Sequence, residues 1–334
     1  MRGKLRPMLI RFTAAGALTL VALAPALTNG PAASAGSARI VRQPGAPAHI
    51  HYLPVNPSHA QANLVYHGGQ VMQKATNTYA IFWEPPKLQT GAPAYLAPGY
   101  NAGVLQYFND VGGTTLYNIY TQYYQIVGGN QQNIKNVSKL AGSWVDTAAY
   151  PKSGCTDPVT PGNCLTDAQI QAEVTHAMQV NGWTASSTNA FFVFTAGGEG
   201  SCFNTGGSCA FNTYCGYHGA FSGTIYSNMP YGATMTSGPQ RRIFCTRTGK
   251  FPNQRDIDME TNILSHEHAE MVTDPQPGSG WTAPDGNEIG DLCSYSFGTR
   301  DEDGGLANQQ WNGHFYLLQR EWDNAVSGCA QDGP

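Results

Sequence analysis

Two short runs of apolar residues, separated by an amphipathic segment, dominate the middle of the chain. Residues 78–83 and 190–194 are mostly aliphatic or aromatic and are closed by Pro or Gly, which is typical of buried strands. Between them, residues 166–183 carry Ile170, Val174 and Met178 at helical spacing. A strand, a helix and a strand in this order favour a parallel pair, so the pattern predicts an α/β fold.

Further elements fit the same interpretation. Residues 104–108 match one face of a short helix, residues 224–226 match a short strand, and residues 256–273 form the clearest helix, ended by Pro275. The chain shows no repeat and no heptad pattern. We therefore expect a single domain over residues 61–334, in which a mixed sheet packs against the helix over residues 256–273.

The N-terminal segment has the layout of a secretory signal peptide. Four basic residues precede an apolar stretch over residues 12–27, and an Ala-Ser-Ala site follows at 33–35. Gly16 and Pro25 interrupt this stretch, which is shorter than the roughly 20 residues that span a bilayer. Residues 1–35 are thus predicted to be removed, and the Ala/Pro/Gly/Ser-rich residues 36–60 to form a flexible leader or pro-segment. The expected location is extracellular, without a membrane anchor.

Charge narrows the classes of partner. Charged residues make up only 12% of the chain, and the formal net charge is −4. Signal cleavage would remove Arg2, Lys4, Arg6 and Arg11 and no acidic residue, which changes the charge to −8. An acidic surface disfavours nucleic acid, so the expected partner is a polypeptide or an extracellular polymer.

The chain contains 8 cysteines, an even number that predicts four disulfides in an exported protein. The sequence does not fix their pairing, but proximity favours Cys155 with Cys164 and Cys202 with Cys209. The remaining pairs are then Cys215 with Cys245 and Cys293 with Cys329. No C-x-x-C pair is present, which disfavours a cysteine zinc cluster and indicates a structural role.

The helix over residues 256–273 carries the clearest chemical motif. His266 and Glu270 are one turn apart and face the same way, so an imidazole and a carboxylate can converge on one metal ion. This is the arrangement of the metallopeptidase HExxH helix with Glu270 in place of the second histidine, and Glu267 then takes the place of the general base. We therefore expect a zincin-like fold with bound zinc. The competing interpretation is a solvated acidic helix face without function.

Several residues compete for the third ligand position. Glu288 is favoured, because it resembles the downstream glutamate of gluzincin-type metallopeptidases, and Asp291 is the alternative as a ligand or as a hydrogen-bond partner of His266. Asp274 would need a sharp turn to reach the metal. His218, next to Cys215, is a candidate catalytic residue that stabilises an oxyanion, a metal ligand, or a structural histidine.

His268 is expected to point away from the face formed by positions 266 and 270, toward the helix surface or a supporting position. The chain has no G-x-S-x-G segment, which disfavours a serine nucleophile. Two-carboxylate glycoside hydrolysis stays open, because the sequence does not give the separation between carboxylates.

A set of segments in a fixed order carries a family resemblance. They are YHGG (66–69), TYAIFW (78–83), CGYHG (215–219), HEHAEMVTDP (266–275), EIGDLC (288–293), NGHFYLL (312–318) and WD (322–323). Together they resemble the EXORDIUM / phosphate-induced protein family, in particular a microbial secreted branch with an HExxE helix. The resemblance implies an extracytoplasmic protein, with plant members in the apoplast, but it implies no established reaction.

Two functions follow as hypotheses. The first is a secreted zinc-dependent hydrolase, a metallopeptidase in which His266, Glu270 and Glu288 hold zinc and Glu267 activates water. The second is a non-catalytic extracellular binding or signalling protein of the EXORDIUM-like type that contacts wall polymers. Aromatic side chains along an open groove, with acidic residues far from His266, would favour the second.

Overall fold

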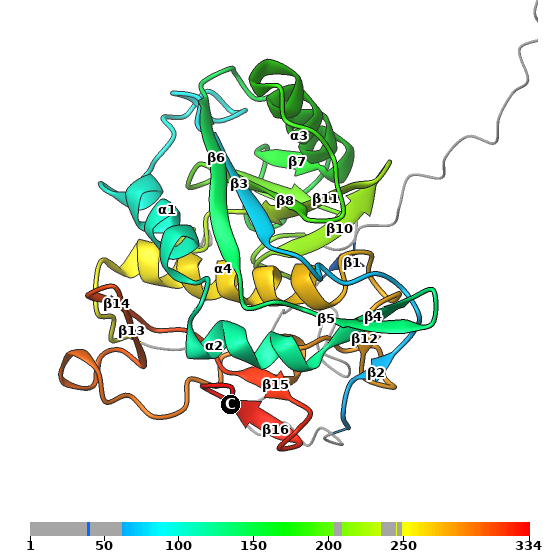
Figure 1. The fold of residues 1–334 in the computed structure, drawn as a ribbon. Coiled ribbons are helices and arrows are strands. Elements are labelled where there is room, and N and C mark those ends of the chain that lie inside the picture. Colours follow the sequence, from blue (N-terminus) through cyan, green and yellow to red (C-terminus); the bar gives the residue numbers. More distant parts are fainter. Residues whose placement is uncertain (1–38, 41–61, 204–208, 235–244, 246–248) are drawn as a thin grey trace, which may run out of the picture. The chain divides into compact units, whose positions relative to one another are not determined.

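The computed structural model describes residues 39–40, 62–203, 209–234, 245 and 249–334 (Figure 1). The predicted signal peptide lies outside the described residues, as does the predicted leader apart from a two-residue strand, β1 (Arg39–Ile40). Among the described helices, none combines the length and the apolar character needed to cross a membrane.

The central element is a six-stranded sheet with the order β1-β10-β11-β8-β3-β6. Its longer strands are β3 (Thr76–Trp83), β6 (Ser138–Asp146), β8 (Asn189–Thr195), β10 (Tyr217–Phe221) and β11 (Thr224–Met229). Strands β6, β3, β8 and β11 are parallel, whereas β10 and β1 are antiparallel to their neighbours. The sheet is therefore mixed, as predicted, and β3 and β8 are the predicted parallel pair.

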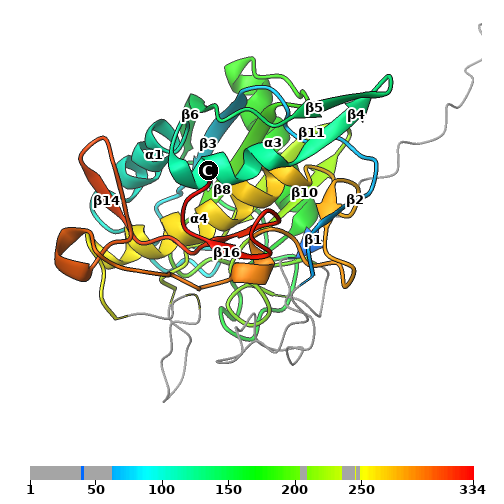
Figure 2. The same cartoon turned by 60° about the horizontal axis from the view of Figure 1, so that its bottom comes forward.

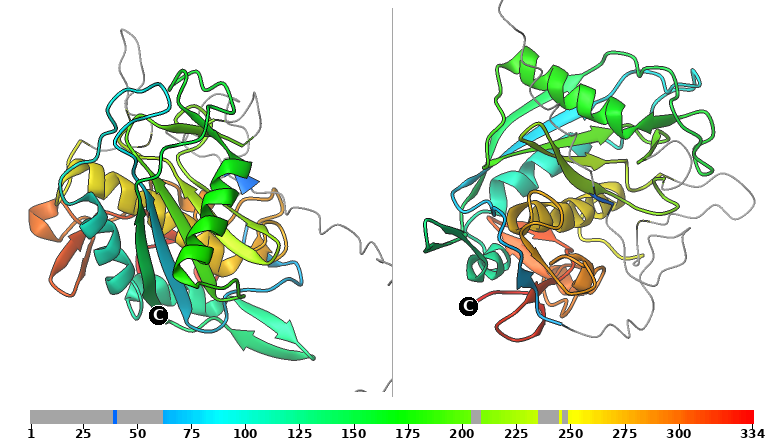
Figure 3. Two further views of the ribbon diagram at one scale, coloured as in Figure 1. Left: turned by 90° about the horizontal axis from the view of Figure 1, so that it is seen from above. Right: turned by 90° about the vertical axis from the view of Figure 1, so that its right-hand side faces the viewer.

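Helices cover both faces of the sheet, and the alternation of side chains along β8 explains this arrangement. Phe191 stacks on Tyr79 of β3 and lies near Trp183, just after α3 (Asp167–Asn181). The next residue, Phe192, faces the opposite way and contacts Phe108 of α1 (Tyr100–Asp110) and His268 of α4 (Arg255–Thr273). Accordingly, α3 lies on one face and α1 and α4 on the other (Figure 3). Both faces are thus covered, which is why β8 is buried throughout.

Local signals set the helix boundaries. Thr166 and Gln169 form a capping box at the start of α3, and Gly182 ends that helix in the left-handed conformation. At the start of α4, the side chain of Gln254 accepts hydrogen bonds from the first backbone N–H groups, and the helix ends at Asp274, before Pro275. The predicted helices over residues 166–183 and 256–273 are confirmed to within two residues at each end.

Helix α4 is buried along nearly its whole length. One side packs on β10 and β11, and the C-terminal segment of the chain crosses the other side (Figure 2). This segment includes β12 (Trp281–Thr282), β13 (Gln309–Trp311), β14 (His314–Tyr316), β15 (Glu321–Asp323) and β16 (Gly328–Ala330). As a result, the polar residues of α4 lie in the interior, where each requires a partner.

Short two-stranded ladders make up most of the remaining structure. β12 pairs with β2 (Val65–Tyr66), β4 (Tyr124–Val127) with β5 (Asn130–Asn133), and β7 (Cys164–Thr166) with β9 (Gly200–Cys202). The pairs β13–β14 and β15–β16 complete the set. A four-residue helix, α2 (Thr115–Asn118), precedes β4.

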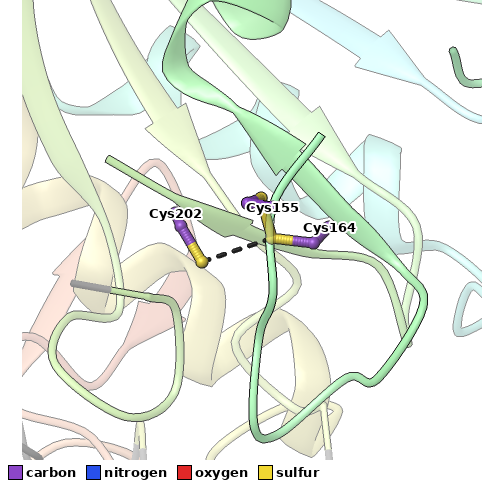
Figure 4. A group of neighbouring side chains, drawn as sticks. All are labelled: Cys155, Cys164 and Cys202. Atoms are coloured by element: carbon purple, nitrogen blue, oxygen red, sulfur yellow. Dashed lines mark hydrogen bonds between the residues drawn. A yellow bond between two sulfur atoms is a disulfide. The ribbon is translucent and has the colours of Figure 1, made fainter. Parts of the chain in front are cut away.

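All four predicted disulfides are confirmed: Cys155–Cys164, Cys202–Cys209, Cys215–Cys245 and Cys293–Cys329. The first two lie side by side, because their strands β7 and β9 are paired, and the sulfur atoms of Cys164 and Cys202 are 3.2 Å apart (Figure 4). Both sulfurs are already in disulfides, so this is a packing contact rather than a metal-binding thiolate pair.

Candidate metal centre

The residues singled out by the sequence converge at the middle of α4. Helix α4 contributes His266, Glu267 and Glu270, and strand β10 contributes His218. Asp291 begins a 3-10 helix (Asp291–Cys293), and Glu288 lies in the loop just before it. Each of these six residues is at most 5% exposed. Buried ionisable groups at this density require paired charges or a bound cation.

One group of potential ligands surrounds His266. Its Nε2 lies 3.1 Å from Glu270 Oε1 and 3.8 Å from Asp291 Oδ1. Two ligands of a tetrahedral zinc ion, each about 2.0–2.2 Å from the metal, lie about 3.3–3.6 Å apart. The three potential ligand atoms of His266, Glu270 and Asp291 all lie within 4.8 Å of one another. They are therefore close enough together to contact one ion.

A second group surrounds His218. Its Nδ1 lies 3.5 Å from Glu267 Oε2 and 3.6 Å from Glu270 Oε2, and its Nε2 lies 3.5 Å from Glu288 Oε2. One nitrogen of His218 and one oxygen each of Glu270 and Glu288 lie within 4.8 Å of one another, as do the ligand atoms of the His266 group. Glu270 belongs to both groups.

The structure therefore divides the predicted ligands differently from the expected set of His266, Glu270 and Glu288. Asp291 lies with His266, whereas Glu288 lies with His218. The side chain of Asp274 belongs to neither group, because its carboxylate accepts hydrogen bonds from the backbone N–H groups of residues 278–280.

The two imidazole rings are held in different ways. His218 Nε2 lies 3.1 Å from the carbonyl oxygen of Asp274, which can only accept, so Nε2 donates to it and Nδ1 is the nitrogen that faces Glu267 and Glu270. His266 Nδ1 lies 3.0 Å from the side-chain nitrogen of Gln319, which also donates to Gly290 O, while the Gln319 oxygen accepts from Tyr295 N. Because Gln319 donates to Nδ1, the proton of a neutral His266 ring is on Nε2. Binding of a metal by Nε2 therefore requires that proton to move to Nδ1.

Two glycines allow the backbone to approach this centre closely. A Cβ atom on Gly290 would lie 2.7 Å from Nδ1 of His266, and one on Gly216 would lie 3.0 Å from Oε1 of Glu267. Both distances are too short for a side chain without displacement of the neighbour. The glycines in the EIGD and CGYH segments are thus explained by packing against the centre.

The electrostatic potential at the centre is strongly negative. Burial lowers the pKa of His266, but the charges of Glu270, Glu267 and Asp291 outweigh burial and leave this pKa well above its ordinary value. Burial likewise lowers the pKa of His218. A hydrogen bond with Glu267 and the charges of Glu270 and Glu267 have a larger, opposite effect, so the pKa of His218 is raised overall. Burial raises the pKa of Glu267 itself. Such a site favours a cation.

Sequence reasoning missed two residues of the centre. Glu321 of β15 is fully buried, and burial raises its pKa well above the ordinary value. The charge of His266 opposes this rise, and the charges of Glu270 and Asp291 add to it. Gln319 holds the ring of His266. Both residues lie far along the chain from the helix motif. Their neighbours Arg320 and Asp323 are also charged, so no local sequence pattern marks them.

A small pocket lies beside the centre. It has a volume of ≈ 20 Å³, which is room for about one water molecule. His266 and Glu267 line it, together with Gly216, Tyr295 and Gln319. Hence the general-base candidate and one of the histidines border the same water-sized space.

No family model, curated protein or solved structure matches this chain. The resemblance to the EXORDIUM / phosphate-induced protein family therefore stays a prediction, and the interpretation of the centre depends on its geometry.

The position of His268 corrects one expectation. This residue does point away from the face of His266 and Glu270, but it is fully buried and does not lie at the helix surface. Its ring packs against Tyr107, Phe108 and Phe192, beneath the sheet. Its pKa is lowered to about 3 by burial.

Proposed function

We propose that the protein is a secreted zinc-dependent hydrolase with a peptidase-like site, built on a zincin-like fold and belonging to a microbial EXORDIUM-like branch. The observation that carries the proposal is the His266 group: Nε2 lies 3.1 Å from Glu270 and 3.8 Å from Asp291, beside a water-sized pocket lined by Glu267. Imidazole with two carboxylates is a ligand set that zinc accepts.

Metal and helix supply different parts of the chemistry. When bound, zinc lowers the pKa of a coordinated water and polarises the scissile carbonyl. Glu267 takes the proton from the attacking water and then delivers it to the leaving nitrogen, which balances the protons of amide hydrolysis. Burial raises the pKa of Glu267, which favours its uptake of a proton from the water. His218 Nδ1 lies 3.5 Å from Glu267 Oε2, beside the general-base candidate.

The distribution of side chains supports this function over the wall-binding alternative. Acidic residues gather around His266 instead of lying far from it. Of the described residues, the exposed large hydrophobic side chains include a single aromatic, Tyr95. An open aromatic groove of the kind that binds polysaccharide would need several.

The test combines metal analysis with proteolysis of denatured casein by purified protein. Glu267→Gln should leave the zinc content unchanged and reduce activity by about 10²–10⁴-fold, because it removes the general base and keeps the side-chain shape. Glu260→Gln is the matched control, since Glu260 is another buried glutamate of α4 that lies outside both ligand groups. This variant should retain activity.

The proposal fails if purified protein binds no zinc, or if Glu267→Gln cleaves casein as fast as wild type. A panel of peptide, ester and glycoside substrates separates the peptidase from other hydrolases. Activity confined to esters or glycosides would contradict the peptidase assignment and retain the hydrolase.

A further inference from the structure

We propose that the centre holds two divalent cations, with Glu270 as the bridge between them. The second ion is held by His218 and Glu288 together with Oε2 of Glu270. This inference rests on the proposed metal-dependent function and extends it from a one-metal to a two-metal site.

The orientation of Glu270 is the first observation. Its Oε1 faces His266 at 3.1 Å, and its Oε2 faces His218 at 3.6 Å. A single carboxylate thus presents one oxygen to each histidine. Hydrolases with two metals about 3.5–4 Å apart use carboxylates of this kind to hold both ions.

The orientation of the His218 ring is the second observation. Its Nε2 donates to the carbonyl oxygen of Asp274, so Nδ1 is the nitrogen that faces Glu267 and Glu270. Metal-binding histidines commonly donate their other ring N–H to a backbone carbonyl in this manner. His218 is 1% exposed, so an ion bound at Nδ1 would lie in the interior and take the place of any proton on that nitrogen.

The number of buried carboxyl groups is the third observation. Five carboxyl groups lie within the centre, none more than 4% exposed: Glu267, Glu270, Glu288, Asp291 and Glu321. Buried carboxylates are stabilised by coordination to cations, so five of them in one centre favour more than one ion.

A simpler role for His218 predicts a different number of bound metal ions. If its Nδ1 only orients Glu267, at 3.5 Å, the protein holds one ion and His218 influences activity through the base. The two roles differ in metal stoichiometry, which can be measured without an activity assay.

The experiment titrates chelator-treated protein with Zn²⁺ and determines bound zinc by calorimetry and by elemental analysis after gel filtration. Wild type should bind two ions per chain, and His218→Gln and Glu288→Gln one each. The matched control is His314→Gln, because His314 pairs with Asp110 at 2.6 Å outside the centre, and it should still bind two. Cobalt-loaded wild type should show magnetic coupling between its ions, which His218→Gln should abolish.

One zinc per wild-type chain together with casein hydrolysis would overturn the two-metal inference and leave the proposed function standing. Retention of two ions by both His218→Gln and Glu288→Gln would also overturn it. No bound zinc would refute both. Near-UV circular dichroism identifies a variant that is misfolded. In that case the number of zinc ions bound by the wild-type chain decides between one metal and two.

Discussion

Two histidines on α4, two residues apart, are both buried but have opposite environments. His266 is 5% exposed and faces Glu270 and Asp291, whereas His268 is fully buried among aromatic rings. Burial lowers the pKa of both histidines. The carboxylates near His266 outweigh this effect and raise its pKa well above the ordinary value, whereas the pKa of His268 is lowered to about 3 by burial. Burial alone therefore does not make a functional histidine.

The difference follows from the helix and its neighbours. A step of two residues turns the side chain to the other side of an α-helix. On one side, α4 meets Phe192 of the sheet and Phe108 of α1. On the opposite side it meets the loop of Glu288 and Asp291 and the segment of Gln319. Ionic chemistry is thus confined to one side of the helix.

The largest expected effects come from substitution of the two histidines, one at a time. His266→Gln should abolish hydrolysis and reduce zinc content, because it removes a ligand and leaves Glu270 and Asp291 close together. His268→Gln should keep zinc bound and lower the melting temperature, since an amide replaces a ring that packs among aromatics. Elemental analysis and thermal melts of both variants measure the two effects.

Equal loss of zinc in both variants would contradict the separation of the two sides of α4. Equal losses of stability with normal zinc content would contradict it too.

The pH dependence of stability should carry the signature of His268. Its folded pKa of about 3 lies below the unfolded value of about 6.5, so the unfolded chain binds the proton first as the pH falls. Stability contributed by the neutral ring is complete above about pH 6.5 and decreases toward pH 3, by up to about 5 kcal/mol. Urea unfolding of wild type and His268→Phe between pH 4 and 7 measures it. The phenylalanine variant should lose less stability on acidification, and parallel curves would be the contrary result.

Removal of disulfides should distinguish the disulfide that closely follows Asp291 from one that is distant from Asp291 along the chain. Cys293–Cys329 closes a separation of 36 residues, and Cys202–Cys209 closes a separation of 7. In the chain-entropy model their loss costs about 4 and about 2.5 kcal/mol of unfolding free energy, respectively. Because Cys293 closely follows Asp291, only the double serine variant of Cys293 and Cys329 should also weaken zinc binding. Equal zinc affinity in both double variants would argue against this link.

A smaller effect is expected at Gly290. The new methyl of Gly290→Ala would lie 2.7 Å from His266 Nδ1, so the ring must shift, at a cost of about 1–3 kcal/mol. Gly249→Ala is the control, because a Cβ there meets no atom within 4 Å. Chemical denaturation and zinc affinity should change for Gly290→Ala alone. An unchanged zinc affinity in Gly290→Ala would show that the ring position of His266 is unimportant.

Much of the fold could be predicted because its signals are local. The strands over residues 78–83 and 190–194 are continuously apolar, and the helix over residues 166–183 is bounded by Thr166 and Gly182, which cap it. Strand β6 was not predicted, because its exposed residues alternate with partly buried ones and its pattern is weak. The short C-terminal strands are too brief for periodicity to be informative.

The candidate centre could be predicted only in part, for the same reason. His266, Glu267 and Glu270 share one helix, so their spacing already places them together. The division of Glu288 and Asp291 between two histidines depends on how the loop crosses α4. Glu321 and Gln319 arrive through long-range packing that leaves no local pattern.

The most direct test of the metal centre is calorimetric titration of zinc into chelator-treated wild type and Glu270→Gln. Glu270 lies in both ligand groups, so its loss affects every way in which the centre can hold an ion. Saturable binding by wild type, and at least tenfold weaker binding by Glu270→Gln, is the result we expect. Zinc binding that is undetectable in wild type, or equally tight in both proteins, would contradict the metal centre.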